Sequence, residues 1–125
     1  MREVDAGSEA RPSILLVDDD EFILDSVGAM VRFLGFDAIL AMTGEEALAR
    51  LSEGLQPDLV ILDMDMPGLG GAGTLPQLRA LRPCLPVVIA TGRVNGIVME
   101  LMRSYSGVGL LPKPFDLGDL RKHLA

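Results

Sequence analysis

The sequence predicts a single α/β domain built on a doubly wound parallel sheet of five strands, with five helices covering its two faces. Its 125 residues suit one domain of ordinary size. Short apolar runs alternate with longer segments of helical period, and three of these runs are continuously apolar, which indicates strands buried on both sheet faces. Because successive strand–helix units connect by right-handed crossovers, the helices are expected on both faces.

Five short apolar runs are the predicted strands. They span Ser13–Val17, Phe36–Ala41, Leu59–Leu62, Pro86–Ala90 and Val108–Leu111. Residues 1–12 precede the first run and mix charged with small residues, without the apolar stretch of a secretory signal. We therefore expect an N-terminal tail over residues 1–12 and a folded domain over residues 13–125.

The first two helices carry the clearest local signals. Residues 23–34 place apolar side chains on one stripe, and Gly35 follows as a stop signal. Thr43 and Glu46 have the spacing of a capping box, in which the threonine hydroxyl accepts from the Glu46 amide and the glutamate carboxylate reaches back. This box predicts the start of a second helix, which ends near Gly54.

The other three helices follow from shorter patterns. Gly73–Leu81 is predicted as a short third helix that Pro83 closes. An apolar stripe between Val94 and Tyr105 predicts the fourth. Asp116 is a suitable cap for a fifth helix. The apolar residues of that last helix are Leu117, Leu120 and Leu124.

The charge balance limits the classes of partner. Eighteen acidic and eleven basic residues give a net charge of −7, which repels a phosphate backbone, so we expect no direct nucleic-acid binding by this domain. No apolar run is long enough to span a membrane. The single cysteine, Cys84, excludes an intramolecular disulfide and fits a reducing compartment. A cytoplasmic location is therefore expected.

Polar side chains follow four of the five predicted strands. They are Asp18 and Asp19 after the first, Asp63 and Asp65 after the third, Thr91 after the fourth and Lys113 after the fifth. With the strand order 2-1-3-4-5, these four strands are consecutive neighbours. Since open α/β sheets bind ligands at the carboxyl ends of their strands, we expect these side chains to share one pocket.

Close carboxylates require a counter-ion. Two unit charges 5 Å apart repel by roughly 3 kcal/mol at an effective dielectric of about 20. Ligands that are all oxygens suit a hard cation that keeps several waters, which favours Mg²⁺ over zinc or copper. Together with a hydroxyl and a lysine, such a cation describes a phosphoryl-transfer site.

Four ordered motifs extend this interpretation. They are ILLVDDD (14–20), PDLVILDMDMPGLGG (57–71), PVVIATG (86–92) and LPKPF (111–115). With them the chain resembles the receiver domain of two-component response regulators over residues 13–125. The resemblance implies a flavodoxin-like fold of the chemotaxis-regulator superfamily. It further implies a signalling domain that catalyses only its own aspartyl phosphorylation and dephosphorylation and is not otherwise an enzyme.

The resemblance also implies roles for individual residues. Asp63 is the expected phosphoacceptor, supplied by a sensor histidine kinase or a phosphotransfer protein. Mg²⁺ is held by Asp18, Asp19 and Asp63, with the backbone carbonyl of Asp65 as a further ligand. Thr91 and Lys113 contact the phosphoryl oxygens, and Lys113–Pro114 is a cis peptide. Asp65 and Arg93 are expected to tune the lifetime of the phosphoryl group, as a pair that covers the path of the attacking water.

One departure from the family concerns the output. Receivers usually carry an aromatic residue three positions before the lysine, and this chain has Leu110 there. We therefore expect phosphorylation to change mainly the fourth helix and the fifth strand, from Gly92 to Leu110. This surface is the expected contact with an effector or a second copy.

Two other classes of function fit parts of the pattern. Asp63-Met64-Asp65 is similar to the nucleophile motif of haloacid-dehalogenase-type phosphatases, but that motif closes their first strand and here it follows the third. A binding module is the second class, either flavodoxin-like or a receiver that no longer takes phosphate. The first strand lacks a glycine-rich phosphate loop, and neither the acids nor the lysine is missing.

Overall fold

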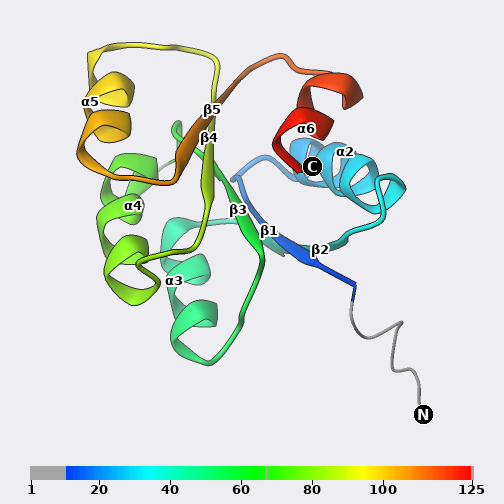
Figure 1. Cartoon of the computed structure of the whole chain (residues 1–125), viewed down its shortest axis with the longest axis horizontal. Helices are drawn as coiled ribbons and strands as arrows, with labels where there is room; N and C mark the ends of the chain where they lie inside the picture. The colour runs from blue at the N-terminus through cyan, green and yellow to red at the C-terminus, as the bar shows by residue number, and fades with distance from the viewer. Residues whose placement is uncertain (1–10, 67, 125) are drawn as a thin grey trace.

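Five parallel strands form one sheet in the order β2-β1-β3-β4-β5, with helices on both faces (Figure 1). This computed structural model describes residues 11–66 and 68–124, so most of the predicted tail 1–12 lies outside the described residues. The elements are β1 (Ser13–Val17), α2 (Glu21–Phe33), β2 (Asp37–Ala41), α3 (Gly44–Ser52), β3 (Leu59–Asp63), α4 (Gly70–Leu81), β4 (Val87–Thr91), α5 (Gly96–Ser104), β5 (Val108–Pro112) and α6 (Leu117–Leu124). The predicted fold class and strand order are confirmed. Within the described ranges, no helix combines the length and the hydrophobicity that crossing a membrane requires.

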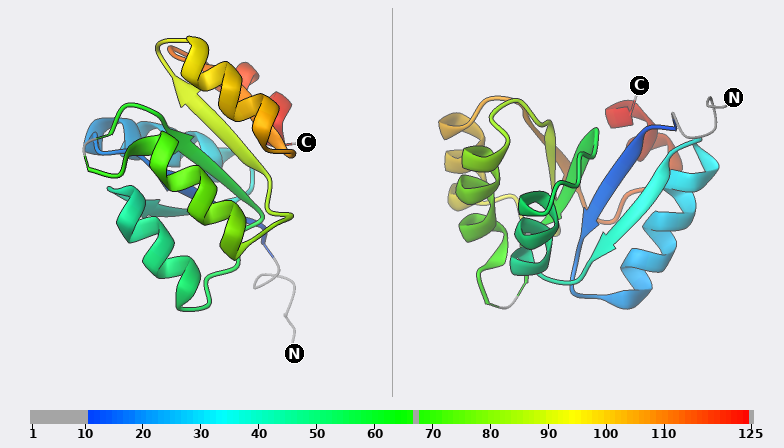
Figure 2. Two further views of the ribbon diagram at one scale, coloured as in Figure 1. Left: turned by 90° about the vertical axis from the view of Figure 1, so that its left-hand side faces the viewer. Right: turned by 90° about the horizontal axis from the view of Figure 1, so that it is seen from below.

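The sheet separates two hydrophobic cores. Helices α2 and α6 cover one face, and α3, α4 and α5 cover the other (Figure 1 and Figure 2). Successive residues of a strand face opposite sides. In β1, Leu15 and Val17 belong to the core under α3, α4 and α5, whereas Ile14 and Leu16 belong to the core under α2 and α6. A strand that serves two cores must be apolar at every position, which is why these runs do not alternate.

Side-chain caps fix where α2 and α3 begin. The carboxylate of Asp20 accepts from the amide of Phe22 at 2.9 Å. The hydroxyl of Thr43 accepts from the amide of Glu46 at 2.9 Å, as the capping box predicts. The Glu46 carboxylate does reach back, but it accepts from the amide of Met42, one residue before the cap. Both helices thus start close to the carboxyl ends of β1 and β2.

Helix α4 begins at Gly70, three residues before the predicted start at Gly73. Leu69 precedes it and offers no capping side chain. Glycines have low helix propensity, so the local pattern gives no sign of this first turn. The turn forms because Gly71 and Thr74 are buried against other segments, which is a tertiary contact.

Helix α5 is shorter than the predicted stripe at both ends. Val94 lies before it and is 51% exposed, and Ile97 in its first turn is 61% exposed. Val98 is the buried residue of this helix. The cap is Asn95, whose side chain accepts from the Val98 amide at 3.1 Å. The start of the apolar stripe therefore faces outward, whereas Leu101, Met102 and Tyr105 are half-buried against the core under α3, α4 and α5.

The turn between α4 and β4 is organised around the guanidinium of Arg79. Its Nη1 donates to the carbonyl oxygens of Arg82, Pro83 and Leu85 at 3.1, 3.3 and 2.6 Å. Its Nη2 donates to the carbonyl oxygen of Ser106 at 3.0 Å. One side chain thus joins the end of α4 to the turn before β4 and to the segment between α5 and β5.

Candidate functional site

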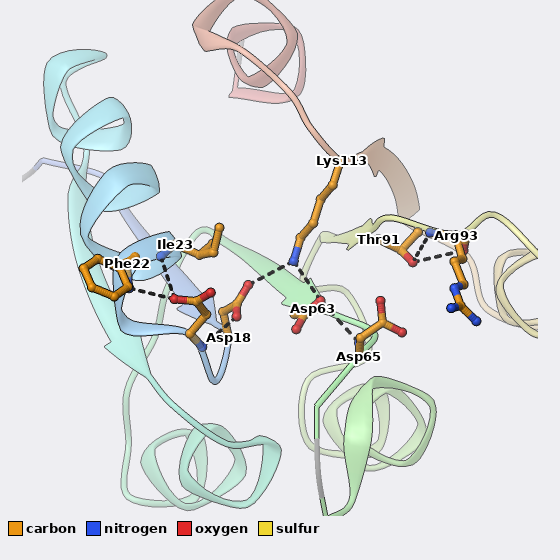
Figure 3. A network of polar contacts seen from close by, with 9 residues as sticks. Asp18, Phe22, Ile23, Asp63, Asp65, Thr91, Arg93 and Lys113 are labelled. Carbon is orange, nitrogen blue, oxygen red and sulfur yellow. Dashed lines mark hydrogen bonds and ion pairs between the residues drawn. The ribbon is translucent and has the colours of Figure 1, made fainter.

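Polar side chains gather at the carboxyl ends of four neighbouring strands (Figure 3). Asp18 directly follows β1, Asp63 is the last residue of β3, Thr91 is the last residue of β4, and Lys113 directly follows β5. Because β3 pairs with β1 and β4, and β4 pairs with β5, these ends are adjacent. The structure therefore brings to one edge the residues that the sequence predicts there.

Lys113 joins two buried carboxylates. Its Nζ lies 3.0 Å from Oδ1 of Asp63 and 3.2 Å from Oδ2 of Asp18 (Figure 3). Asp63 is 2% exposed and Asp18 is 6% exposed. The peptide bond between Lys113 and Pro114 is cis, as the resemblance implies. A single ammonium group thus serves two carboxylates that are largely shielded from solvent.

The electrostatics of this cluster are set by burial and by shared charge. Burial raises the pKa of the Asp63 carboxyl above its ordinary value, and the charge of Asp18 adds to this, while the hydrogen bond from Lys113 opposes it. For Lys113, burial acts to lower the pKa, but the hydrogen bond and charge of Asp63 and the charge of Asp18 raise it overall. The ammonium is therefore firmly protonated at neutral pH, whereas the ionised Asp63 is under-compensated.

Three carboxylates form a group able to hold a metal ion. Oxygen atoms of Asp18, Asp19 and Asp63 lie within 4.8 Å of one another. All three donors are hard oxygens, and Asp19 is exposed, which leaves room for the waters that Mg²⁺ keeps. The ammonium of Lys113 faces three carboxylates, so a dication would offset the remaining negative charge of the cluster. The side chains fit Mg²⁺, while the Asp65 carbonyl ligand stays a prediction.

Thr91 lies at the site, but its hydroxyl is engaged elsewhere. Its Oγ1 donates to the carbonyl oxygen of Arg93 and accepts from the amide of Arg93, both at 3.0 Å (Figure 3). The side chain is buried, being 1% exposed. A threonine can form such a turn with its own backbone two residues on. Sequence reasoning identified Thr91 but missed this bond, because either orientation of the hydroxyl suits the same residue type.

The expected Asp65–Arg93 pair is not formed. Both residues are in the described part of the chain, and their side chains make no ion pair there. Asp65 contributes through its backbone instead, because its amide donates to Oδ1 of Asp63 at 3.3 Å. This contact was not predicted, since a backbone donor carries no signature of residue type.

A groove of about 490 Å³ opens beside Lys113. It is lined by Ile23, Ser26, Val27, Met30, Gly92, Lys113, Pro114 and Phe115. The sequence pattern assigned Ile23 and Met30 to the core stripe of α2, but both are only half-buried and border the groove. Helical periodicity identifies an apolar face without showing where the sheet beneath it stops, so the groove could not be predicted.

The chain matches a known protein family and is similar to several curated proteins. Residues 14–125 match the family model of the response regulator receiver domain. The chain is 34% identical over 109 residues to the transcriptional regulatory protein PrrA of Mycobacterium tuberculosis, covering 87% of this chain and 46% of that protein. It is 36% identical over 107 residues to the response regulator MprA of Mycolicibacterium vanbaalenii, covering 86% and 46%. The chain thus spans less than half the length of these curated relatives.

Solved structures agree on the fold. Chemotaxis protein CheY4 of Vibrio cholerae superposes with a TM-score of 0.84 at 26% identity, covering 92% of this chain and 97% of that one. The receiver domain of the hybrid histidine kinase CckA superposes with a TM-score of 0.75 at 30% identity, covering 90% and 94%. The phosphatase and binding-module alternatives are not favoured by these comparisons.

Proposed function

Because this chain belongs to the family of response regulator receiver domains, we propose that Asp63 accepts a phosphoryl group from a phosphohistidine. The donor is a sensor histidine kinase or a phosphotransfer protein. The observation that carries the proposal is the buried Asp63 carboxylate, 3.0 Å from the Lys113 ammonium and grouped with Asp18 and Asp19. Receiver domains are signalling domains, and phosphoryl transfer is the signal that this site is suited to take.

The two oxygens of Asp63 have different surroundings. Oδ1 accepts from Nζ of Lys113 and from the amide of Asp65, whereas Oδ2 receives no hydrogen bond from the residues that the structure describes. We assign the attack to Oδ2. A bond forms between Oδ2 and phosphorus while the phosphorus–nitrogen bond of phosphohistidine breaks, and the histidine nitrogen keeps that electron pair. The product is an acyl phosphate on Asp63, and its later hydrolysis completes the only cycle that the domain catalyses.

Charge compensation is the main task of the other residues. The Lys113 ammonium has donors to spare for a phosphoryl oxygen, and the Thr91 hydroxyl can supply one more after leaving Arg93. Mg²⁺ held by Asp18, Asp19, Asp63 and the Asp65 carbonyl would neutralise charge on the carboxylates and the phosphoryl oxygens.

The groove beside Lys113 supports a protein donor. A phosphohistidine must come within bonding distance of Asp63, so its carrier has to rest on the surface next to the site. The apolar side chains of Ile23, Met30 and Phe115 offer that contact. We propose that the kinase or phosphotransfer protein docks here in the cytoplasm. The net charge of −7 makes a nucleic acid an unfavourable partner for the domain itself.

The test is mass spectrometry after incubation with acetyl phosphate and Mg²⁺. The wild-type chain should gain one phosphoryl group, and the Asp63→Asn variant should gain none. Asp65→Asn is the matched control, because it removes an exposed carboxylate two residues away and should still be modified. The same gain in Asp63→Asn would disprove the assignment. Steady turnover of a phosphate monoester would support a phosphohydrolase instead.

A further inference from the structure

The first turn of α4 lies directly against the backbone that follows Asp63. Gly71 is buried there. A methyl group added at Gly71 would lie 2.7 Å from the carbonyl oxygen of Asp63 and 2.8 Å from Cα of Met64. Side-chain carbons do not approach other atoms so closely, and backbone atoms cannot rotate away as a side chain can. Any residue larger than glycine must therefore displace either α4 or the peptide between Asp63 and Met64.

The opposite side of this turn is also closed. Thr74 is fully buried, and its hydroxyl donates to the carbonyl oxygen of Gly70 at 2.5 Å. The same hydroxyl faces Gly44 at the start of α3, where an added methyl group would overlap it. Thr74 thus packs closely on Gly44, and this contact opposes a movement of α4 toward α3. A larger residue at position 71 therefore acts on the backbone of Asp63.

That backbone controls the hydrogen bonding of the Asp63 carboxylate. The amide of Asp65, two residues on, donates to Oδ1 at 3.3 Å. Moving the peptide between Asp63 and Met64 moves this amide as well, and it turns the Asp63 side chain relative to Lys113. We propose that Gly71 is a positioning residue for the phosphoacceptor. Its missing side chain lets α4 hold the Asp63 carboxylate in register with Lys113 and the Asp65 amide. The proposal rests on the role of Asp63 given above.

Gly73 provides the matched control. It lies on the same helix, but a methyl group there would meet Cδ1 of Leu69 at 2.8 Å, the far end of a flexible side chain. Gly71→Ala and Gly73→Ala make the same replacement in the first turn of the same helix. A difference between the two variants therefore reports the contact with the Asp63 backbone.

The experiment combines a rate with a local probe, on the full chain at a temperature where unfolding curves show complete folding. Gly71→Ala should be phosphorylated by acetyl phosphate at least tenfold more slowly than wild type, and Gly73→Ala at the wild-type rate. In metal-free ¹H–¹⁵N spectra without donor, the Asp65 amide resonance should move in Gly71→Ala and stay in place in Gly73→Ala. The Asp63→Asn spectrum shows how far the Asp65 amide resonance moves when the Asp63 carboxylate itself is changed.

The outcomes separate this inference from the proposed function. A folded Gly71→Ala with an unmoved Asp65 resonance and the wild-type rate overturns the positioning role. If wild type is not phosphorylated at all, the proposed function fails, while the Asp65 resonance still tests the contact. If Gly71→Ala does not fold in buffer, both measurements are made on all variants in sucrose, an osmolyte that favours the compact state. An unmoved Asp65 resonance and the wild-type rate in the folded variant would overturn the inference there as well.

Discussion

The hydroxyl of Thr91 is bonded twice to the backbone of Arg93, donating to its carbonyl oxygen and accepting from its amide at 3.0 Å each. A hydroxyl has one proton, so Thr91 cannot donate to a phosphoryl group on Asp63 while it donates to Arg93. After phosphorylation, the carbonyl oxygen of Arg93 and a phosphoryl oxygen on Asp63 therefore compete for the Thr91 hydroxyl proton. The charged phosphoryl oxygen is the stronger acceptor.

When Thr91 breaks its hydrogen bonds to the Arg93 backbone, we expect the resulting conformational change to extend into α5. This helix has Val98 as its buried anchor and begins just after Arg93. Amide exchange with and without beryllofluoride, a mimic of the phosphoryl group, should change from Gly92 to Leu110. In Thr91→Ala the change should be confined to the loops around Asp18 and Asp63. Silence between Gly92 and Leu110 in the wild-type chain would contradict this account.

Asp63→Asn should stabilise the metal-free protein at neutral pH. The pKa of Asp63 is raised in the folded chain by burial, so this carboxyl favours folding below its unfolded pKa, near 3.8, and that contribution is lost as the pH rises through the folded pKa. At pH 7 the variant should melt at a higher temperature than wild type, and the difference should shrink as the pH falls toward 3.8. Asp25→Asn, at an exposed position of α2, should change little. A difference that is independent of pH would refute the electrostatic origin.

Mg²⁺ should stabilise the fold through Asp19 and not through Asp20. At ten times its dissociation constant, an ion that binds only the native state adds about 1.4 kcal/mol. Asp19→Ala should abolish this gain. Asp20→Ala should keep it but lower the metal-free stability by about 1 kcal/mol, because Asp20 caps α2. Thermal melts with and without Mg²⁺ measure both effects, and a gain that survives in Asp19→Ala would argue against the acidic group as the metal site.

Arg93→Ala should speed hydrolysis of the acyl phosphate several-fold. The Arg93 side chain is exposed and forms no ion pair with Asp65 among the described residues, so it is available to cover the phosphoryl group once that is present. Backbone contacts of Thr91 are kept in this variant. Arg103→Ala, at the far end of α5, is the control. Loss of the phosphorylated mass over time gives the rate, and equal rates for wild type and Arg93→Ala would leave Arg93 without this role.

Met30→Glu should separate docking from chemistry. Met30 borders the groove beside Lys113, and Asp63 is not among the residues that line this groove. Transfer from a sensor kinase that phosphorylates the wild-type chain should slow at least tenfold, whereas the rate with acetyl phosphate should not change. Phe33→Glu makes the same change on α2 at an exposed residue outside the groove. If Phe33→Glu slows the kinase as much as Met30→Glu, the effect is one of charge and not of docking in the groove.

The sequence predicts those features that depend on short-range pattern. Strands that serve two cores are apolar throughout, and parallel strands end at one edge, so residue pattern alone is enough to place Asp18, Asp63 and Lys113 together. The start of α4 at Gly70 and the hydroxyl orientation of Thr91 could not be predicted. The start of α4 depends on its contacts with other segments, and the Thr91 hydroxyl orientation depends on one side-chain rotamer. Residue type alone predicts neither.

The hydrogen bonds of Arg79 have a consequence for insertions and deletions. Surface loops far from a functional site usually tolerate changes in length. Here the carbonyls of residues 82, 83 and 85 must all reach one guanidinium, whose Nε is buried without a hydrogen-bond partner among the described residues. One residue inserted after Pro83 would displace these carbonyls and break hydrogen bonds to the guanidinium, each worth about 1.5–3 kcal/mol because the donor is charged. Substitutions at the exposed Pro83 and Cys84 keep these backbone carbonyls, so at these positions the α4–β4 connection tolerates a change of residue better than a change of length.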